Sequence, residues 1–534
     1  MNSDRESAHS DKSADALTER FAQRRTAHSQ MRGNVKKPLR VMKFGGTSLG
    51  DASCIEEVAE IIRSSTHESD VVVVVSAMSG VTNKLIDAAT RSETGDRLAV
   101  ASLFEELRKQ HRSVVSTLIH SSAQRDRIGR KTEELFQEGE RLCEGTMLLR
   151  ELTPRVLDTV SSLGERLSAP LVAAVLAERG VASEAIEATE LVVTDSCHGA
   201  AEPCMNLTER RCKARLQTLR QQGVVPVITG FIGATEEGVL TTLGRGGSDY
   251  SATILGAALN ADEVIIWTDV NGLMTADPRQ VPGACTIPEI SYREAAELAY
   301  FGAKVLHPKT LRPVMQSGIP LWIRNTFAPG RAGTKITPDA NANGSGVKAL
   351  TAMKDVALIT VGGPGFFGVT DVVGRAFATI AAVRADVLLI SQSSSRNDIC
   401  LVVSAAVAKH TVEALRREFA HDLANEKAEH ITVDYSIAIV AVVGQDMRGV
   451  AGVAGRMFGA LSRENVGVIA IAQGASDCNV SFVVAQKDMK AALVATHGEF
   501  ELGTLNVEAL PVRKSSNRST AWYYESGRSS AEAD

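Results

Sequence analysis

The sequence predicts an α/β protein in which a largely parallel sheet between helix layers is followed by a duplicated module. Three observations carry this prediction. Short β-branched runs that end in glycine alternate with helical stretches through the first part of the chain. The block that follows repeats its own pattern at one fixed offset. Aromatic residues make up only 4% of the 534 residues, which favours close backbone packing over a β-sandwich.

Glycines and small residues mark the ends of the first predicted elements. A strand is expected over Leu39–Phe44, where aliphatic residues stop at two glycines, and a helix from about Ala52 to Ser64. The consecutive valines Val71–Val75, bounded by small residues, predict a strand that is buried on both faces of a parallel sheet.

The middle of the chain continues the alternation. The stretch from Thr90 to Glu178 is expected to be mainly helical, with breaks near Pro154 and Gly164. Strands should follow over Val224–Phe231, Gly238–Leu243 and Glu263–Thr268, with a helix over Tyr250–Leu259. This order predicts a doubly wound sheet, which binds its ligands at the carboxyl ends of its strands.

The last part of the chain is an internal duplication. Val356–Val361 aligns with Ile437–Val442, and Gly374-Arg375 aligns with Gly455-Arg456, each pair 81 positions apart. Each copy shows a strand, a glycine turn, a helix, two strands and a helix. That order predicts a ferredoxin-like βαββαβ module in two copies.

These patterns divide the chain into five parts. We expect a flexible N-terminal extension at 1–37, an α/β domain at 38–340, modules at 341–432 and 433–513, and a flexible C-terminal tail at 514–534. Both ends are polar and lack aliphatic clusters. A small polar run at 341–346 is expected to link the domain to the modules.

Charge and apolar content exclude several classes of protein. The 58 Lys+Arg and 63 Asp+Glu give a formal net charge of −5, so neither nucleic acid nor an anionic membrane is expected as a partner. The longest apolar runs fall short of the roughly 20 residues of a membrane span, and the N-terminus has no apolar signal-peptide core. We therefore expect a cytoplasmic protein.

The 8 cysteines are scattered, without a Cys-x-x-Cys pair, and are expected to be reduced thiols. Cys197, His198, Cys204 and Cys212 lie close together in sequence, but their spacing fits no common zinc site. No metal held by protein side chains is predicted.

Two glycine-rich loops between a strand and a helix are candidates for anion binding. In Lys43–Ser48, glycine backbone N–H groups and the lysine could hold a phosphate. In Gly244–Tyr250, Arg245 could hold a carboxylate or phosphate through two parallel hydrogen bonds, while Asp249 could simply cap the helix. Together the loops suggest two anionic groups facing each other, as phosphoryl transfer requires.

A third loop, Gly363–Gly368, matches Gly-x-Gly-x-x-Gly between a strand and a helix. A dinucleotide-binding fold would place an acidic residue at the end of the next strand, but that strand ends in Ser391-Gln392. The duplicate copy has Asp446 in place of the middle glycine. We interpret this loop as a turn of the repeated module rather than a nicotinamide site.

Seven motifs follow one another along the chain: Lys43–Ser48, Ser76–Asn83, Gly164-Glu165, Gly244–Tyr250, Trp267–Gly272, Asp277–Arg279 and Phe301–Pro308. Together, and in this order, they resemble the aspartate kinase family. The resemblance extends over about residues 38–510. The repeat resembles the paired ACT regulatory modules of that family, and the settings of Gln392 and Gln473 look most like the kinase portion of bifunctional aspartokinase–homoserine dehydrogenases.

The resemblance implies an amino-acid-kinase fold followed by two ferredoxin-like ACT modules. It also implies an enzyme that uses ATP with Mg²⁺ to phosphorylate the β-carboxylate of L-aspartate. The product would be 4-phospho-L-aspartate, the first intermediate of lysine, threonine and methionine biosynthesis. A homo-oligomer formed through the ACT modules is implied as well.

Carried over to matching positions, the resemblance implies a role for individual residues. The catalytic residues would be Lys43, on the transferring phosphoryl group, and Asp249, which would orient the reacting end or organise Lys43 and Mg²⁺. The aspartate pocket would hold the α-carboxylate with Arg245 and the α-ammonium with Glu165, completed by Ser76 and Thr82. The nucleotide site would be lined by Lys43, Phe44, Gly45, Gly46, Thr268, Asp269, Met274, Arg279 and Lys304, with Gly45 and Gly46 donating backbone N–H bonds.

One position departs from the pattern of some relatives. Met274 stands where a tyrosine often packs beside the adenine, and methionine can still pack against a purine. Gln392 and Gln473 end equivalent strands, and we expect them to bind an inhibitory end-product amino acid, threonine or lysine. Buried polar caps of the sheet are the alternative for these two glutamines.

Three other interpretations remain open on the sequence. A sister amino-acid kinase would act on glutamate, N-acetylglutamate or a nucleotide. A non-catalytic amino-acid sensor would keep only the effector modules, although Lys43, Arg245 and Asp249 argue against it. A truncated bifunctional dehydrogenase would need a strand and glycine fingerprint, which the polar residues after Val512 do not show.

Overall fold

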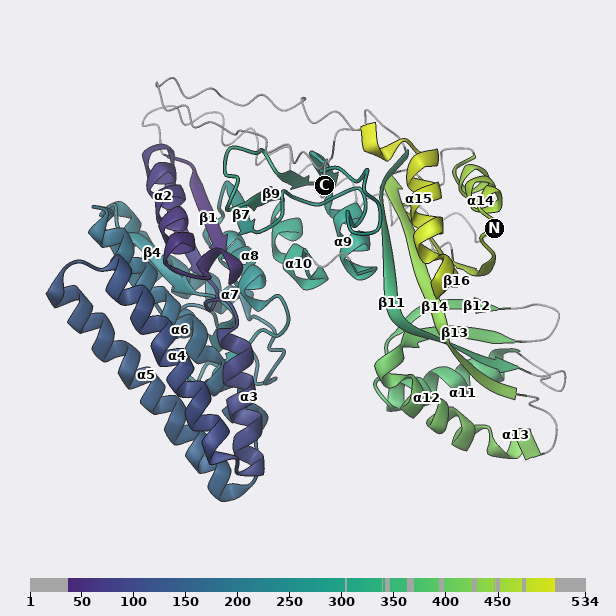
Figure 1. Cartoon of the computed structure of the whole chain (residues 1–534), viewed down its shortest axis with the longest axis horizontal. Coiled ribbons are helices and arrows are strands. Elements are labelled where there is room, and N and C mark those ends of the chain that lie inside the picture. Colours follow the sequence, from purple (N-terminus) through teal and green to yellow (C-terminus); the bar gives the residue numbers. More distant parts are fainter. Residues whose placement is uncertain are drawn as a thin grey trace, which may run out of the picture. The chain divides into compact units, whose positions relative to one another are not determined.

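The structure, a computed structural model, describes residues 37–302, 305–338, 340, 346–362, 369–392, 398–424, 430–445, 447, 452–472 and 477–504. The chain forms two compact units. The first comprises the chain up to Asn271 with Ser291–Pro329 and Lys335–Asn343, and the second comprises Gly272–Ile290, Gly330–Thr334 and the chain from Gly344 onward. Figure 1 shows the elements of both units.

An eight-stranded sheet runs through the first unit in the order β3-β4-β2-β1-β7-β9-β10-β8. From β3 to β9 every neighbouring pair is parallel, which confirms the predicted parallel sheet. The strands span Leu39–Phe44 (β1), Asp70–Val75 (β2), Ser183–Ile186 (β3), Val225–Thr229 (β4), Glu263–Thr268 (β7), Glu289–Ser291 (β8), Leu321–Asn325 (β9) and Thr334–Thr337 (β10). A separate hairpin pairs Ile232–Ala234 (β5) with Leu240–Thr242 (β6).

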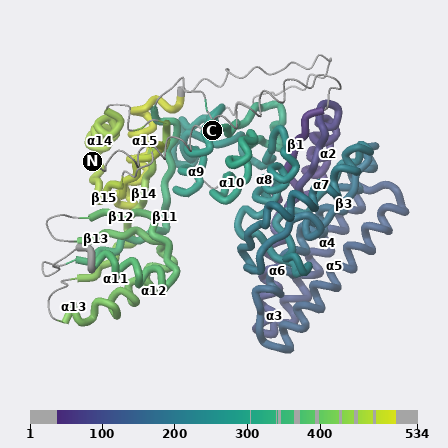
Figure 2. The backbone as a smooth tube through the Cα atoms, turned by 180° about the vertical axis from the view of Figure 1, so that it is seen from behind, coloured from purple at the N-terminus to yellow at the C-terminus, as the bar shows by residue number. Residues whose placement is uncertain are grey.

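Helices cover both faces of this sheet, as the doubly wound prediction requires. They are Ala52–Glu68 (α2), Val81–Thr94 (α3), Arg97–Leu118 (α4), Ser122–Leu149 (α5), Pro154–Glu178 (α6), Met205–Gln221 (α7), Gly247–Leu259 (α8), Tyr292–Tyr300 (α9) and Pro308–Ser317 (α10). On one face α2 and α6 pack on the strands and α3 to α5 pack on these helices, whereas α7 and α8 pack on the other face. On the face covered by α8, α10 packs against α8 and α9 packs against α10 (Figure 2).

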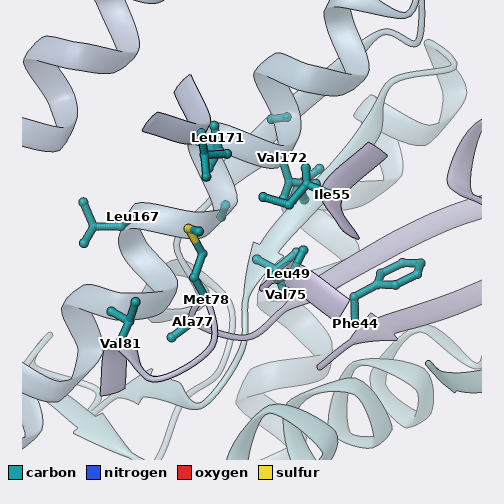
Figure 3. Close-up of a cluster of buried hydrophobic side chains, with 14 of the residues drawn as sticks. Phe44, Leu49, Ile55, Val75, Ala77, Met78, Val81, Leu167, Leu171 and Val172 are labelled. Carbon is teal, nitrogen blue, oxygen red and sulfur yellow. The ribbon is translucent and has the colours of Figure 1, made fainter. Parts of the chain in front are cut away.

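The alternation of side chains along β1 sends neighbouring residues to opposite layers. Met42 and Phe44 join the large core beneath α2 to α6, and Lys43 between them points toward α8. All five valines of Val71–Val75 are buried, so the prediction of a strand covered on both faces is confirmed. Figure 3 shows part of this core, a cluster of buried hydrophobic side chains that includes Phe44, Val75 and, from α6, Leu171 and Val172.

The predicted break near Gly164 is wrong, because α6 continues through it. The glycine serves close packing instead of ending the helix. A Cβ at Gly164 would lie 2.5 Å from the Cβ of Ala77, in the loop after β2. The break at Pro154 is confirmed, since proline occupies the first turn of α6, where its missing N–H leaves no bond unmade.

The second unit contains a six-stranded sheet in the order β12-β13-β11-β14-β16-β15. Its elements are Gly346–Gly362 (β11), Val369–Ala382 (α11), Val387–Gln392 (β12), Ile399–Ser404 (β13), Ala405–Glu418 (α12), Ala420–Ala424 (α13), His430–Gln445 (β14), Val453–Arg463 (α14), Val468–Ala472 (β15), Asn479–Ala485 (β16) and Met489–Glu499 (α15). The predicted order of strand, helix, two strands and helix occurs twice.

The two modules share their central strands. The first part of β11, Gly346–Met353, pairs with the second part of β14, and the rest of β11 pairs with His430–Ile437. Each long strand therefore serves both copies, as Figure 1 lets the reader follow. The predicted boundary between residues 432 and 433 lies inside β14.

The duplication extends to individual side chains. Arg375 donates to Glu418 at 2.8 Å and lies 4.5 Å from the ring centre of Phe419. In the second copy, Arg456 donates to Glu499 at 3.0 Å and lies 4.6 Å from the ring centre of Phe500. Each arginine joins one helix to the end of the next helix in its own module. The 81-residue repeat is thus preserved in its packing as well as its pattern.

Several predictions fall outside the described residues. They concern most of the extension at 1–37, the run at 341–345, the loop Gly363–Gly368 and the tail at 514–534. Among described helices, only α6 is long and apolar enough to cross a membrane, and 83% of its most apolar window is buried inside the protein. This is the pattern of a core helix.

Candidate active site

A cavity of about 700 Å³ opens in the first unit at the carboxyl ends of β1 and β2. Loops after both strands, the first turns of α3 and α8, and one face of α6 line it. Seven predicted site residues meet there: Lys43, Gly46, Ser76, Thr82, Glu165, Arg245 and Asp249. The fold thus brings together residues from four separate stretches of the sequence, at the edge where a doubly wound sheet binds ligands.

The ion pair between Lys43 and Asp249 stands at the base of this cavity. The Nζ of Lys43 lies 2.5 Å from the Oδ1 of Asp249, and both side chains are largely buried. Asp249 is the third residue of α8, yet its side chain does not cap the helix. The alternative reading of Asp249 as a helix cap is therefore wrong. A lysine held this way is positioned, and its charge is available to a phosphate that enters the cavity.

Arg245 lies in the turn before α8. The glycines on either side of it, Gly244 and Gly246, take φ values of 78° and 69°, which only glycine adopts without strain. Arg245 is exposed, and among the described residues it forms no hydrogen bond or ion pair. Its guanidinium is thus a free two-pronged donor at the mouth of the cavity.

Glu165 contributes a buried carboxyl group from the middle of α6. Its side chain is 3% exposed, and burial raises its pKa to about 8. The Ser248 hydroxyl lies 3.5 Å from Oε1, while Oε2 has no hydrogen-bond partner among the described residues. A buried carboxyl oxygen without a donor costs free energy unless a ligand supplies one. An ammonium group in the cavity would satisfy it.

Ser76 and Thr82 flank the loop between β2 and α3. The Ser76 backbone N–H donates to the Phe44 carbonyl at 3.1 Å, which ties this loop to the end of β1. Gly80 has a φ of 78° and lets α3 begin at Val81. The N-terminal N–H groups of α3 and α8 thus border the same cavity, where they favour negatively charged ligand groups.

Sequence reasoning missed Asp158, which also lines the cavity and is 2% exposed. It precedes Glu165 by seven residues on α6, with Ser161 between them, so all three lie on one helix face. A polar stripe with spacing i, i+3, i+7 along an otherwise apolar helix was the available signal.

The structure corrects one expectation in the first glycine loop, the free N–H of Gly45, and places the side chain of Phe44 in the core. The Gly45 N–H donates to the Trp267 carbonyl at 3.1 Å, so it is not free for a phosphate. The Phe44 side chain is fully buried and stacks on Trp267 with ring centres 6.1 Å apart, so it belongs to the core. Gly46 lines the cavity, and a Cβ there would lie 3.1 Å from the Ala77 carbonyl oxygen.

The other predicted nucleotide residues are divided between the two units. Thr268 is the last residue of β7 in the first unit and Asp269 follows it, with the Thr268 hydroxyl 3.2 Å from Asp269. Met274 and Arg279 lie in Gly272–Ile290, which belongs to the second unit. Arg279 forms a two-pronged ion pair with Asp277 at 2.7 Å. Lys304 lies outside the described residues.

The segment Gly272–Ile290 is held firmly within the second unit. Thr275 lies 3.0 Å from the buried His497 of α15, and its carbonyl accepts from the Leu350 N–H at 2.7 Å. The Cys285 thiol donates to the Leu502 carbonyl at 3.1 Å. The stretch that carries two predicted nucleotide contacts is therefore attached to the duplicated modules.

Gln392 is the last residue of β12 and is exposed, so it is not a buried polar cap. Gln473 lies outside the described residues. Both edge strands also expose aliphatic side chains: Ile390 in β12 and Ile469 and Ile471 in β15 are each nearly half exposed. In the part of the chain that the structure describes, no three His, Cys, Asp or Glu residues gather as a metal site.

The donor set of the cavity fits an anionic and zwitterionic ligand pair. One lysine, one free arginine and two helix N-termini favour phosphate and carboxylate groups, while Glu165 favours an ammonium group. Such an arrangement can bring a carboxylate and a phosphate together in spite of their repulsion.

Comparison with known proteins gives family matches over most of the chain. A model of the amino acid kinase family matches residues 38–325. An ACT domain model matches residues 359–419 and again 440–500. The second ACT match lies 81 residues after the first, which is the offset of the repeat.

Similar proteins come from several organisms. The chain is 33% identical over 461 residues to a bifunctional aspartokinase/homoserine dehydrogenase of Haemophilus influenzae, covering 86% of this chain and 56% of that protein. It spans about half the length of the curated relatives that head the comparison.

Two solved structures of E. coli aspartokinase III are also similar. One, in complex with aspartate and ADP (R-state), gives a TM-score of 0.74 and 30% identity, covering 87% of this chain and 100% of that one. The other, in complex with lysine and aspartate (T-state), gives a TM-score of 0.70 and 31% identity, covering 86% and 99%.

Proposed function

The chain belongs to the amino acid kinase family, among the aspartokinases, and we propose that it phosphorylates the β-carboxylate of L-aspartate with ATP to give 4-phospho-L-aspartate. The family membership confirms the resemblance drawn from the seven motifs. The observation that carries the proposal is the pairing, in one cavity, of the buried and unsatisfied Glu165 with the free cation Arg245. An α-amino acid presents an ammonium and a carboxylate that match these two groups.

The nucleophile of this reaction needs no general base. The β-carboxylate of aspartate is ionised at pH 7, so the barrier lies in bringing it against the charged γ-phosphate. Lys43 would neutralise the transferring phosphoryl group, and Asp249 would keep the Lys43 ammonium aimed at it. Gly46 and the first turns of α3 and α8 would add backbone N–H groups around the phosphates.

Mg²⁺ would enter with the nucleotide, as part of the ATP substrate. Mg²⁺ commonly uses one or two carboxylates together with substrate phosphates. The donor set fits this use, because Asp249 is the carboxylate nearest Lys43, while Asp158 is occupied by protein donors and Glu165 is matched to an ammonium. The ion would supply further positive charge against the transferring phosphoryl group.

The ACT modules would make the activity responsive to an end product, threonine or lysine. Gln392, exposed at the end of β12, supports such a site, and Gln473 is its equivalent in the second copy. The aspartokinase III structure with lysine and aspartate is described as a T-state, which supports lysine as one candidate.

We also propose a homo-oligomer formed through these modules, because exposed isoleucines on two edge strands favour pairing with another chain. A cytoplasmic location is consistent with all eight cysteines being free.

A hydroxylamine trap tests the activity, because acyl phosphates form hydroxamates. L-Aspartate, glutamate and N-acetylglutamate are compared with ATP and Mg²⁺. Hydroxamate with L-aspartate alone supports the proposal, while a preference for either other acid would refute it in favour of a sister kinase. The variant Lys43→Ala should lower turnover far more than it raises the KM for aspartate, since the lysine acts on the phosphoryl group. Changes of equal size in turnover and in the KM for aspartate would refute this role of Lys43.

A further inference from the structure

Asp158 is a buried carboxylate that the mechanism above does not use. It lies on the same face of α6 as Glu165 and borders the same cavity. Burying a carboxylate is costly unless protein donors replace the lost water. The contacts that it makes should therefore show what it does.

Asp158 accepts hydrogen bonds from two distant segments. Its carboxylate lies 2.8 Å from the Nδ1 of His198 and 3.1 Å from the Gly199 N–H. It also accepts from the Thr242 N–H at 3.2 Å and from the Thr242 hydroxyl at 2.5 Å. One side chain on α6 thus joins the turn at residues 197–199 to the end of β6.

Both segments border the turn that carries Arg245. Thr242 is the last residue of β6 and precedes Arg245 by three residues. The Gly199 carbonyl packs closely against the turn at Gly244, because a Cβ on Gly244 would lie 2.9 Å from the carbonyl oxygen. The backbone of the turn that carries Arg245 is therefore held by Gly199 and Thr242, which both donate hydrogen bonds to Asp158.

The Gly199 N–H, the Thr242 N–H and the Thr242 hydroxyl all donate, so the site requires an acceptor. A carboxylate offers two acceptor oxygens and no donor, whereas an amide of the same shape presents an N–H₂ group to one side. In Asp158→Asn that group would face at least one backbone N–H or the Thr242 hydroxyl. The turn would then have to shift to relieve the conflict.

We propose that Asp158 is a positioning residue for amino-acid binding, which holds the Gly244–Gly246 turn so that Arg245 meets the α-carboxylate of the substrate. This inference rests on the proposed function. It assigns Asp158 no contact with the phosphoryl group, so its loss should weaken substrate binding and leave phosphoryl transfer largely intact.

The test compares Asp158→Asn with the wild-type enzyme in the hydroxamate assay. Because geometric displacement near a site is costly, the KM for aspartate should rise about tenfold or more, while kcat stays within about threefold. The KM for ATP should not change. The matched control is Glu294→Gln, which alters another buried carboxyl group, bound by Ser291 and outside the cavity.

A double-mutant cycle separates positioning from general damage. Because Asp158 would act through Arg245, adding Asp158→Asn to Arg245→Ala should raise the KM for aspartate little further. If the KM increases of the two single variants multiply in the double variant, the proposal is overturned. An unchanged KM for aspartate in Asp158→Asn, or a KM increase of equal size in Glu294→Gln, would overturn it as well. If Asp158→Asn does not fold, Thr242→Val and His198→Ala each remove one donor to the same carboxylate and should show a smaller form of the same effect.

The histidine offers a conservative rescue. His198→Asn keeps a nitrogen donor near the position of Nδ1, so it should retain a KM closer to wild type than His198→Ala. Equal KM values in the two variants would contradict the role of this hydrogen bond. A wild-type enzyme without aspartate-dependent hydroxamate would refute the proposed function, whereas an active wild type with these negative results would refute only the role of Asp158.

Discussion

Replacing Glu165 by glutamine should make the protein more stable, increasingly so as the pH rises. The ordinary pKa of this carboxyl group is 4.5, and burial raises it to about 8 in the folded protein. At pH 7 the unfolded chain ionises the group, about 2.5 pH units above its ordinary pKa, while the folded protein keeps it protonated. At 1.36 kcal/mol per pH unit, this difference costs about 3 kcal/mol of folding free energy.

The sign follows from proton binding. Between pH 4.5 and about 8 the folded state binds more protons at this site than the unfolded state, so wild-type stability falls as the pH rises. Glutamine does not titrate. The advantage of Glu165→Gln should therefore be near zero at pH 4.5 and grow by about 1.4 kcal/mol per pH unit up to pH 8.

Urea unfolding of the two proteins at pH 5, 6, 7 and 8 measures this difference directly. Gln at the exposed position Glu144 is the surface control and should leave the pH dependence as in the wild type. Aspartate should raise the urea midpoint of the wild type and not that of Glu165→Gln, because an amide cannot pair with the α-ammonium. A stability difference that does not change with pH would refute the reasoning.

Four further outcomes are expected. Between pH 6.5 and 8.5 the wild-type KM for aspartate should fall, because the α-ammonium needs the ionised form of the buried glutamate; steady-state kinetics check this, and a flat profile would contradict it. Gly164→Ala, whose Cβ would meet the loop after β2 at 2.5 Å, should cost both activity and thermal stability, whereas Gly145→Ala in α5, with open space around it, should stabilise by about 0.5–1 kcal/mol. Thr275→Val, which removes the hydrogen bond to His497, should raise the KM for ATP without changing the KM for aspartate. Equal KM values for ATP in the variant and the wild type would show that the segment Gly272–Ile290 does not contribute to nucleotide binding. Gln392→Ala should weaken inhibition by threonine or lysine at unchanged basal kcat, and wild-type activity that resists both at millimolar levels would exclude this control.

Local signals were sufficient for most elements of the fold. Val71–Val75 reads as a buried strand because a sheet covered on both faces needs apolar residues at every position. The repeat was equally plain, since one offset aligns Arg375 with Arg456, and the two side chains make equivalent contacts. Gly164 misled the helix prediction, because a glycine that breaks a helix and one that lets a loop approach it look alike in sequence.

The site was predictable where the motif itself carries the chemistry. Lys43, Arg245 and Asp249 lie in glycine loops at strand ends, and the fold brings them to one cavity with Glu165. The fate of the Gly45 N–H was not predictable, because its acceptor, the Trp267 carbonyl, is remote in sequence. The polar stripe on α6 could have drawn attention to Asp158, but its hydrogen-bond partners were not predictable, since they come from two other segments.

The sequence by itself determined the order of elements, the duplication, the chemical groups available and the family to which they belong. Hydrophobic period, glycine placement and motif spacing are local properties, and they suffice for these. Only the tertiary structure decided which donors are already used, which carboxyl group is left unsatisfied, and that β11 and β14 each serve both modules. Burial and hydrogen-bond partnership depend on residues that are distant along the chain, so the pKa of Glu165 and the task of Asp158 arise only when the chain folds.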